Sequence, residues 1–226
     1  MAHYHLETND DGSIRRILRD GEPNSTSVSL EQLFSIVTLY FKVAGSNLQL
    51  LEKEDSKPLR RAYGVQEFIM SLTGVEAFTN TYFKLRGDEL ADPRLAERVG
   101  KRHGSVTRKI EELLAMTPEG TIEDQATIIA RLHELTLLRN TLVHPQWEPA
   151  SMTLAATVPV MIQGLVHNFQ AAFEEAPFCR EALMWCLLLV ARIGKARGNA
   201  DLSSFLFRWT GIYGLTEVQL MSELGI

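Results

Sequence analysis

Cysteine is scarce in this chain, with two among 226 residues, and the spacing of the two excludes a disulfide between them. Cys179 and Cys186 fall on one predicted helix, about 10 Å apart along its axis and beyond the reach of an S–S bond. No Cys and His spacing of the kind that holds zinc accompanies them. Because a secretory start is missing too, we expect a cytoplasmic protein with buried thiols, no bound metal ion and no cofactor.

Long apolar runs and glycine-rich loops are missing as well. The most apolar stretch, Ala182–Ala191, is shorter than the about 20 residues that span a bilayer, so it predicts a core helix and no membrane contact. The sequence has no phosphate-binding loop, nucleophile elbow, zinc-protease histidine pair or carboxylate cluster of metal-binding spacing. A net charge of -5 argues against indiscriminate coating of nucleic acid but leaves room for a local basic site.

Hydrophobic periodicity predicts an all-α fold for most of the chain. We expect helices over residues 29–52, 58–87, 121–144, 158–173, 180–196 and 202–209, with a charged stretch at 92–116 and a tail after 209. The first helix begins with a capping box of Ser29 and Gln32, and the second begins at Pro58. Gly100 and Gly104 favour a break within the charged stretch.

This pattern divides the chain into three segments. Residues 1–28 are polar, and the turn-forming sequence Asn-Asp-Asp-Gly at 9–12 separates two short segments that either pair as a hairpin or stay disordered. Residues 29–175 are expected to form an antiparallel helical bundle. Residues 176–226 add C-terminal helices, which serve as a dimerisation element, a substrate clamp or a completion of the core.

An arginine interrupts the apolar stripe of the helix predicted over 121–144. The stripe recurs at helical spacing and consists of Ile128, Leu132, Leu135 and Leu142. A rotation of 100° per residue places Arg139 on the same face, where its charge requires an ion pair, a subunit interface or a bound anion. His144 precedes Pro145, which unwinds the helix and lets the imidazole turn back towards the guanidinium. Such a pair suits phosphate binding and proton transfer.

The segment from Arg139 to His144 resembles the signature of the HEPN superfamily, in which an arginine, often followed by a polar residue such as Asn140, precedes a closing histidine. The resemblance rests on these three residues and extends over residues 29–175 as architecture. It implies a helical bundle with the motif near the end of a long core helix. It also implies a metal-independent ribonuclease that acts as a homodimer, although the superfamily includes inactive members that bind partners or nucleotides.

A carboxylate and an amide lie among apolar residues of the helix predicted over 58–87. Leu72, Glu76, Asn80 and Phe83 follow one another at helical spacing, so both polar groups need partners. Glu76 is placed to orient Arg139 through a bidentate pair. An ordinary structural salt bridge explains the same position equally well.

Basic residues dominate the stretch between residues 94 and 109, where Glu97 is the single acid. The six are Arg94, Arg98, Lys101, Arg102, Arg108 and Lys109. The opposing apolar stripe consists of Leu95, Val99, Val106 and Ile110. The segment can therefore pack on the core while presenting positive charge to an RNA backbone. A solvated surface is the alternative.

The resemblance favours an endoribonuclease in which His144 acts as general acid or base, Arg139 stabilises charge on phosphorus, and Asn140 positions RNA. One imidazole does not easily serve both proton transfers at one phosphate, so a homodimer with two motifs across one cleft makes chemical sense. The main alternative is a non-catalytic HEPN-like module that binds a partner protein, a nucleotide or RNA in a toxin–antitoxin or phage-defence system. A third is a structural protein in which Arg139 pairs with a carboxylate and His144 caps the helix.

Overall fold

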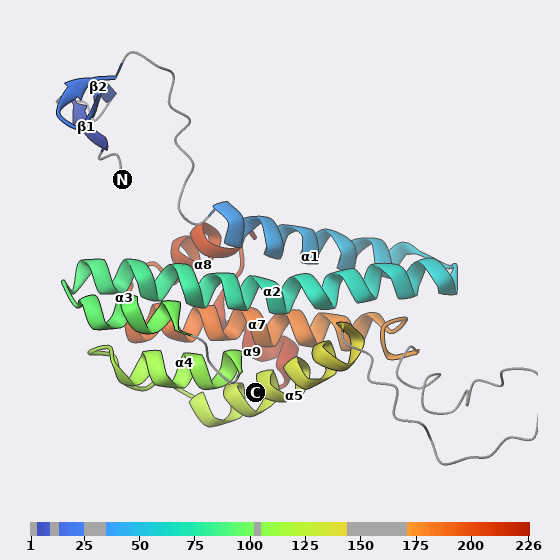
Figure 1. Ribbon diagram of the computed structural model, residues 1–226. Coiled ribbons are helices and arrows are strands. Elements are labelled where there is room, and N and C mark those ends of the chain that lie inside the picture. Colours follow the sequence, from blue (N-terminus) through green and yellow to red (C-terminus); the bar gives the residue numbers. More distant parts are fainter. Residues whose placement is uncertain (1–3, 10–13, 25–34, 102–104, 144–170) are drawn as a thin grey trace, which may run out of the picture. The chain divides into compact units, whose positions relative to one another are not determined.

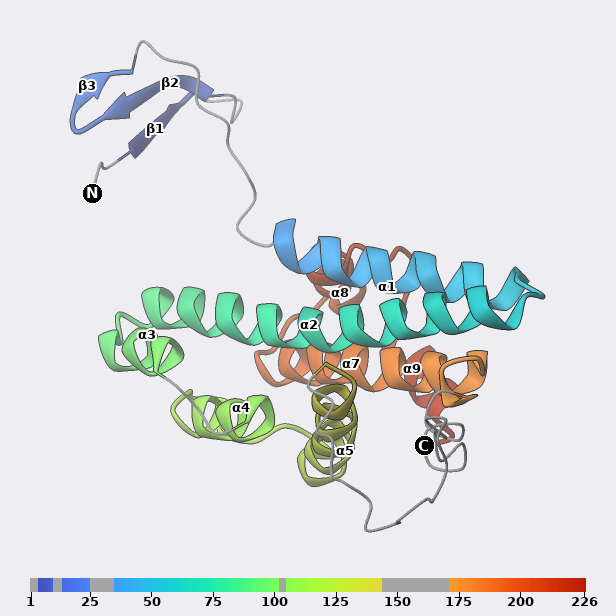
Figure 2. The same ribbon diagram turned by 45° about the vertical axis from the view of Figure 1, so that its right-hand side comes forward.

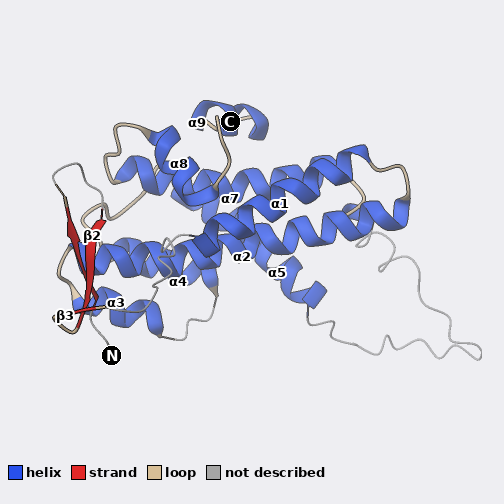
Figure 3. Ribbon diagram, turned by 90° about the horizontal axis from the view of Figure 1, so that it is seen from above, coloured by secondary structure: helices blue, strands red, loops and turns tan. Residues whose placement is uncertain are grey.

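The computed structural model describes residues 4–9, 14–24, 35–101, 105–143 and 171–226. The chain divides into two compact units, residues 1–32 and 33–226. Within the described ranges, all strands belong to the first unit and all helices to the second (Figure 3). The predicted all-α class is therefore confirmed for the larger unit.

The first unit is a small antiparallel sheet with the strand order β1-β2-β3. Its strands are β1 (Tyr4–Thr8), β2 (Ile14–Arg19) and β3 (Glu22–Pro23). Glu7 of β1 lies opposite Arg16 of β2, and the two form a salt bridge across the strands. The hairpin alternative for residues 1–28 is thus the one that the structure adopts. The sequence analysis does not predict β3, although Asp20 and Gly21, with φ of 54° and 90°, form a strong turn signal.

The second unit is helical throughout its described part. Its helices are α1 (Ser35–Lys53), α2 (Lys57–Glu89), α3 (Pro93–Gly100), α4 (Val106–Ala115), α5 (Gln125–Val143), α7 (Ala176–Ala196), α8 (Leu202–Thr210) and α9 (Glu217–Leu224). Several begin at capping side chains: Asp92 accepts from the Arg94 backbone N–H, and Ser105 accepts from that of Arg108. Because these caps satisfy amides that have no helical partner, they fix where α3 and α4 start.

The core of the helical unit is built around α7. Helices α1, α2 and α7 run side by side, with α1 and α2 antiparallel, while α5 crosses the direction of α7 (Figures 1 and 2). Leu187–Val190 of α7 are fully buried, as are Phe41 of α1 and Phe78 of α2. Gly64 lets α2 approach the backbone of Phe173 closely, since a Cβ at Gly64 would lie 1.9 Å from the Phe173 carbonyl oxygen. The segment 176–226 thus contributes side chains to the core.

Some of the helix bounds predicted from the sequence agree with the structure, and others do not. Helix α2 and helix α8 match the predicted 58–87 and 202–209, and the charged stretch breaks between Gly100 and Ser105 as its glycines indicate. The tail after 209 instead contains α9, which begins with a capping box of Thr216 and Gln219 that the sequence analysis overlooks. Residues 29–34 and most of the helix predicted over 158–173 lie outside the described residues. Within the described ranges, no helix combines the length and hydropathy of a membrane span.

Candidate functional site

Four polar side chains from three helices meet on one side of α2, and we call them the Arg139 cluster. Arg139 of α5 contacts Glu76 of α2, with 3.3 Å between Nη1 and Oε2. One turn further along α2, Asn80 Oδ1 accepts a hydrogen bond of 2.6 Å from Lys109 Nζ of α4. Lys109 also donates to the Val99 carbonyl oxygen at 2.6 Å. Glu76, which the sequence analysis placed beside Arg139, and Asn80, for which it expected a partner, therefore lie in the same cluster.

The position of Arg139 along α5 decides how it is presented. Leu132 and Leu135 are buried and mark the inner face of the helix, and a rotation of 100° per residue places Arg139 on that face. Arg139 lies beyond Thr136, the last buried residue of α5, and its side chain is 23% exposed. Near this end of the helix the guanidinium reaches both a carboxylate and solvent.

The ion pair between Arg139 and Glu76 is loose. Charge-assisted N–H···O bonds are usually about 2.7–2.9 Å long, and this one is a single contact of 3.3 Å to a carboxylate that is 50% exposed. The bidentate geometry considered for Glu76 is absent from the described structure. Among the described residues, no other side chain or carbonyl contacts the Arg139 guanidinium. Most of its donors therefore remain available to another oxyanion.

Lys109 adds a second, partly buried cation to the cluster. Burial lowers the pKa of Lys109, and the negative charge of Glu76 partly offsets that effect. The negative charge of Glu76 therefore acts on both cations of the cluster. The cluster consequently holds two positive charges against one negative charge, an arrangement that attracts anions.

The remaining members of the predicted catalytic motif are described only in part. Asn140 is exposed on the last turn of α5, which ends at Val143. His144 is the next residue in the chain, and it lies outside the described residues, as does Arg102.

The basic segment is more nearly neutral than its composition indicates. Its salt bridges join Arg94 to Asp92, Arg98 and Arg108 to Glu112, and Lys101 to Glu97. Asp92 and Glu112 lie outside the range 94–109, so a count of the charges within that range overlooks them. The predicted apolar stripe is buried at Leu95 and Ile110. Since exposed ion pairs contribute at most about 1 kcal/mol, an RNA phosphate can still compete for these arginines.

Two features of the unit escape sequence reasoning. Arg192, near the C-terminal end of α7, is 1% exposed and contacts Glu123, Asp124 and Glu217. A second group, described below, gathers around Tyr82 and Arg86 at the end of α2. Neither leaves a local signal, because the partners of each residue come from distant segments. Within the described residues, no group of three or more His, Cys, Asp or Glu side chains is placed to hold a metal ion.

Comparison with known proteins does not indicate a family or a function for this chain. No family model, no curated protein and no solved structure matches this chain.

Proposed function

We propose that the helical unit is a metal-independent endoribonuclease of HEPN type. The observation that supports this most is Arg139, which lies near the end of α5 with most of its donors available, in one cluster with Lys109 and five residues before His144 in the sequence. A half-buried guanidinium and a histidine are a pair of groups that can bind a phosphodiester and serve its chemistry.

The reaction divides between these residues. The RNA 2′-hydroxyl attacks phosphorus, the bond to the 5′-oxygen breaks, and a 2′,3′-cyclic phosphate and a 5′-hydroxyl result. His144 accepts the 2′-hydroxyl proton or donates a proton to the leaving oxygen. Arg139 stabilises the negative charge that develops on the phosphoryl oxygens, Glu76 orients its guanidinium, and Asn140 positions the RNA. Lys109 adds positive charge to the same site.

Cleavage of a mixed RNA pool in the presence of EDTA tests the proposal. We expect the unaltered protein to produce cyclic-phosphate ends, and His144→Ala and Arg139→Ala to lose them. Because removing a general acid or base costs about 10²–10⁴-fold in rate, the loss in His144→Ala should be complete at matched protein concentration. His133→Ala is the matched control, since His133 is an exposed histidine of α5, the helix that ends at the residue before His144.

The outcomes separate clearly. Cyclic-phosphate ends that persist in His144→Ala would contradict the role assigned to His144. A lack of cleavage by the unaltered protein would contradict the catalytic proposal. It would favour the second candidate, a non-catalytic HEPN-like module that binds RNA, a nucleotide or a partner protein such as an antitoxin. The existing contact between Glu76 and Arg139 supports that candidate, because it gives the arginine a structural partner.

A homodimer is part of the proposal because the two proton transfers at one phosphate need two groups. Leu137 and Val143 support an interface on α5: they are 54% and 48% exposed and flank Arg139 and Asn140 in sequence. We expect a dimer in sedimentation analysis, and Leu137→Glu with Val143→Glu should give a folded monomer without cleavage activity. Leu59→Glu, at a 46% exposed leucine of α2, should change neither property. An active monomer would contradict a composite site.

A further inference from the structure

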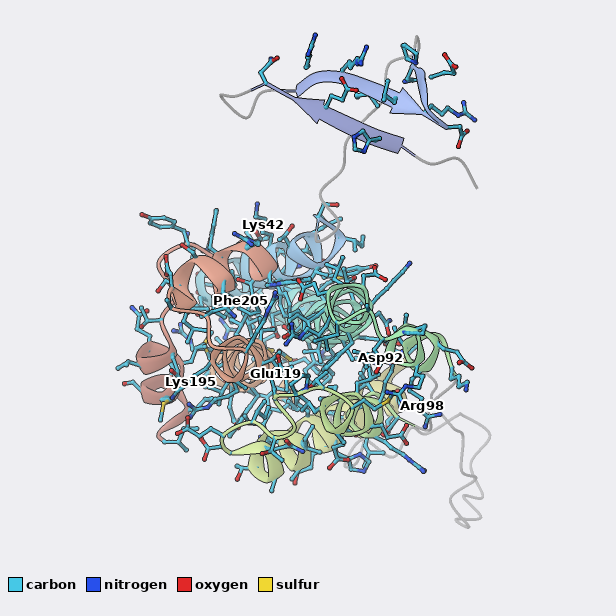
Figure 4. All side chains as sticks on the ribbon, turned by 90° about the vertical axis from the view of Figure 1, so that its left-hand side faces the viewer. Lys42, Asp92, Arg98, Glu119, Lys195 and Phe205 are labelled. Atoms are coloured by element: carbon cyan, nitrogen blue, oxygen red, sulfur yellow. The ribbon has the colours of Figure 1, made fainter. Side chains whose placement is uncertain are left out.

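A small pocket lies where the C-terminal parts of α2 and α7 meet α8, on a different face of α2 from the Arg139 cluster. Its volume is about 180 Å³, and its walls include Tyr82, Arg86, Arg197, Phe205, Arg208 and Trp209. Figure 4 looks onto this end of the helical unit and labels Phe205 of α8. Gly194 of α7 makes room for that ring, because a Cβ there would lie 2.5 Å from Phe205 Cδ1.

Two hydrogen-bond donors of residues that line the pocket lack a protein partner among the described residues. They are the Tyr82 hydroxyl and Arg86 Nε, and both atoms are buried. A buried polar group without a partner costs about 1–3 kcal/mol, so such groups usually have a function. Burial raises the pKa of Tyr82 to about 12, and the charge of Glu119 acts in the same direction. The hydroxyl is consequently protonated at neutral pH and able to donate.

The charges around the pocket leave one cation unneutralised. Glu89 pairs with Arg86 and, through two contacts of 2.8 and 2.9 Å, with Arg197. Glu119 binds the other end of the Arg86 guanidinium. Arg208 is exposed at the rim and has no ion pair among the described residues. The pocket therefore has a positive charge at its rim, from Arg208, and hydrogen-bond donors on Tyr82 and Arg86 that are unpaired in the described part of the chain.

Aromatic rings form the inner wall. The centroid of Tyr82 lies 6.3 Å from that of Phe205 and 5.9 Å from that of Trp209. These rings give the pocket an apolar side that a simple inorganic ion would leave unused. A cavity of about 150 Å³ accepts benzene, so the pocket has room for a single flat ring.

We propose that this pocket binds a small organic oxyanion, a phosphate ester or carboxylate carried on one flat apolar group. The Tyr82 hydroxyl and Arg86 Nε donate to the anion, Arg208 supplies the attracting charge, and the ring lies against Phe205 and Trp209. The site is independent of the proposed ribonuclease chemistry, and its test needs no RNA.

Calorimetric titration with phenyl phosphate, benzoate and inorganic phosphate tests this site. We expect phenyl phosphate or benzoate to bind, and to bind at least tenfold more tightly than inorganic phosphate. Tyr82→Phe and Arg208→Ala should each weaken binding roughly tenfold, the effect of losing one charge-assisted hydrogen bond or one close charge. Lys84→Ala, which removes an exposed cation from the opposite side of α2, should leave affinity unchanged.

Thermal unfolding of the free proteins distinguishes a ligand-binding role of Tyr82 from a structural one. Because the hydroxyl has no partner among the described residues, Tyr82→Phe should unfold at or above the temperature of the unaltered protein. Preference for phenyl phosphate over benzoate would identify a phosphate ester, and the reverse a carboxylate; both support the proposal. Absence of binding by all three probes at millimolar concentration would overturn it. So would equal affinity for inorganic phosphate, or binding that both variants leave unchanged.

Discussion

Glu67→Gln should make the protein more stable than the unaltered chain at pH 8.5 by about 4 kcal/mol, while the two should differ little at pH 5. Glu67 lies on α2 with its side chain fully buried. Its Oε1 accepts a hydrogen bond of 2.7 Å from the Ser71 hydroxyl, and Oε2 has no partner among the described residues. The carboxyl is thus placed where its neutral form is strongly favoured.

The direction of the pH effect follows from the pKa. Burial raises the pKa of Glu67 from 4.5 to about 8, although the hydrogen bond from Ser71 and the nearby thiol of Cys179 act in the opposite direction. The folded protein therefore holds a proton that the unfolded chain has released. Stability falls as the pH rises from about 4.5 to about 8, by about 1.4 kcal/mol for each pH unit, and levels off above that range. Glutamine keeps the neutral shape without a proton to lose.

Urea unfolding of both proteins between pH 4.5 and 9 measures this difference. The informative quantity is the free energy of unfolding of Glu67→Gln minus that of the unaltered protein, since other titrating groups cancel in it. Glu111→Gln, at an exposed glutamate of α4, is the control and should show no such trend. Parallel pH profiles for the Glu67 variant and the unaltered protein would show that Glu67 is ionised in the folded state.

Arg192→Met should lower the free energy of unfolding by about 3 kcal/mol. The guanidinium is 1% exposed, and its Nη1 and Nη2 lie 2.8 Å from Glu123 and 2.6 Å from Asp124, with Glu217 also in contact. Methionine preserves the packing of the side-chain stem but leaves three carboxylates facing one another. Glu123 and Asp124 are about half exposed and can regain water, which keeps the cost near the lower end of the range for broken buried pairs.

Lys195 provides the matched comparison for this prediction. It contacts two of the same carboxylates, with 2.7 Å from Nζ to Glu123 and 3.2 Å to Glu217, but its side chain is 50% exposed. Lys195→Met should therefore cost less than about 1 kcal/mol. Urea unfolding measures the free energy of unfolding of both variants. An equal decrease in the two would contradict the view that burial makes the Arg192 ion pairs more stabilising than those of Lys195.

Sequence periodicity predicts α2 and α8 well because each has one continuous apolar face and a clear start or stop. The exposure of Arg139 is harder to predict. Periodicity places Arg139 on the buried face of α5, together with Leu132 and Leu135. The buried residues of that helix nevertheless end at Thr136, and how far the cover of this face extends along α5 depends on where α2 and α7 pack against it. Periodicity alone cannot supply that information.

The contact between Glu76 and Arg139 is predictable because each residue is a charge within an apolar stripe and each requires a partner. Arg192 is a different case. Its carboxylate partners lie 25 to 69 positions away along the chain, and no pattern near α7 points to them. The pocket at Tyr82 is equally hidden, because Arg86, Arg197 and Arg208 each resemble an ordinary surface arginine until the fold brings them together.

Helix α2 extends without a break over 33 residues and contributes Glu67 to the core, Glu76 to the Arg139 cluster and Tyr82 to the pocket. Each added or deleted residue rotates everything beyond it by about 100° and shifts it by about 1.5 Å. One insertion between Glu67 and Glu76 would therefore displace both sites from their partner helices at once. Point substitutions leave this phasing intact, so the two sites can diverge independently in residue type, whereas the length of α2 is constrained by both.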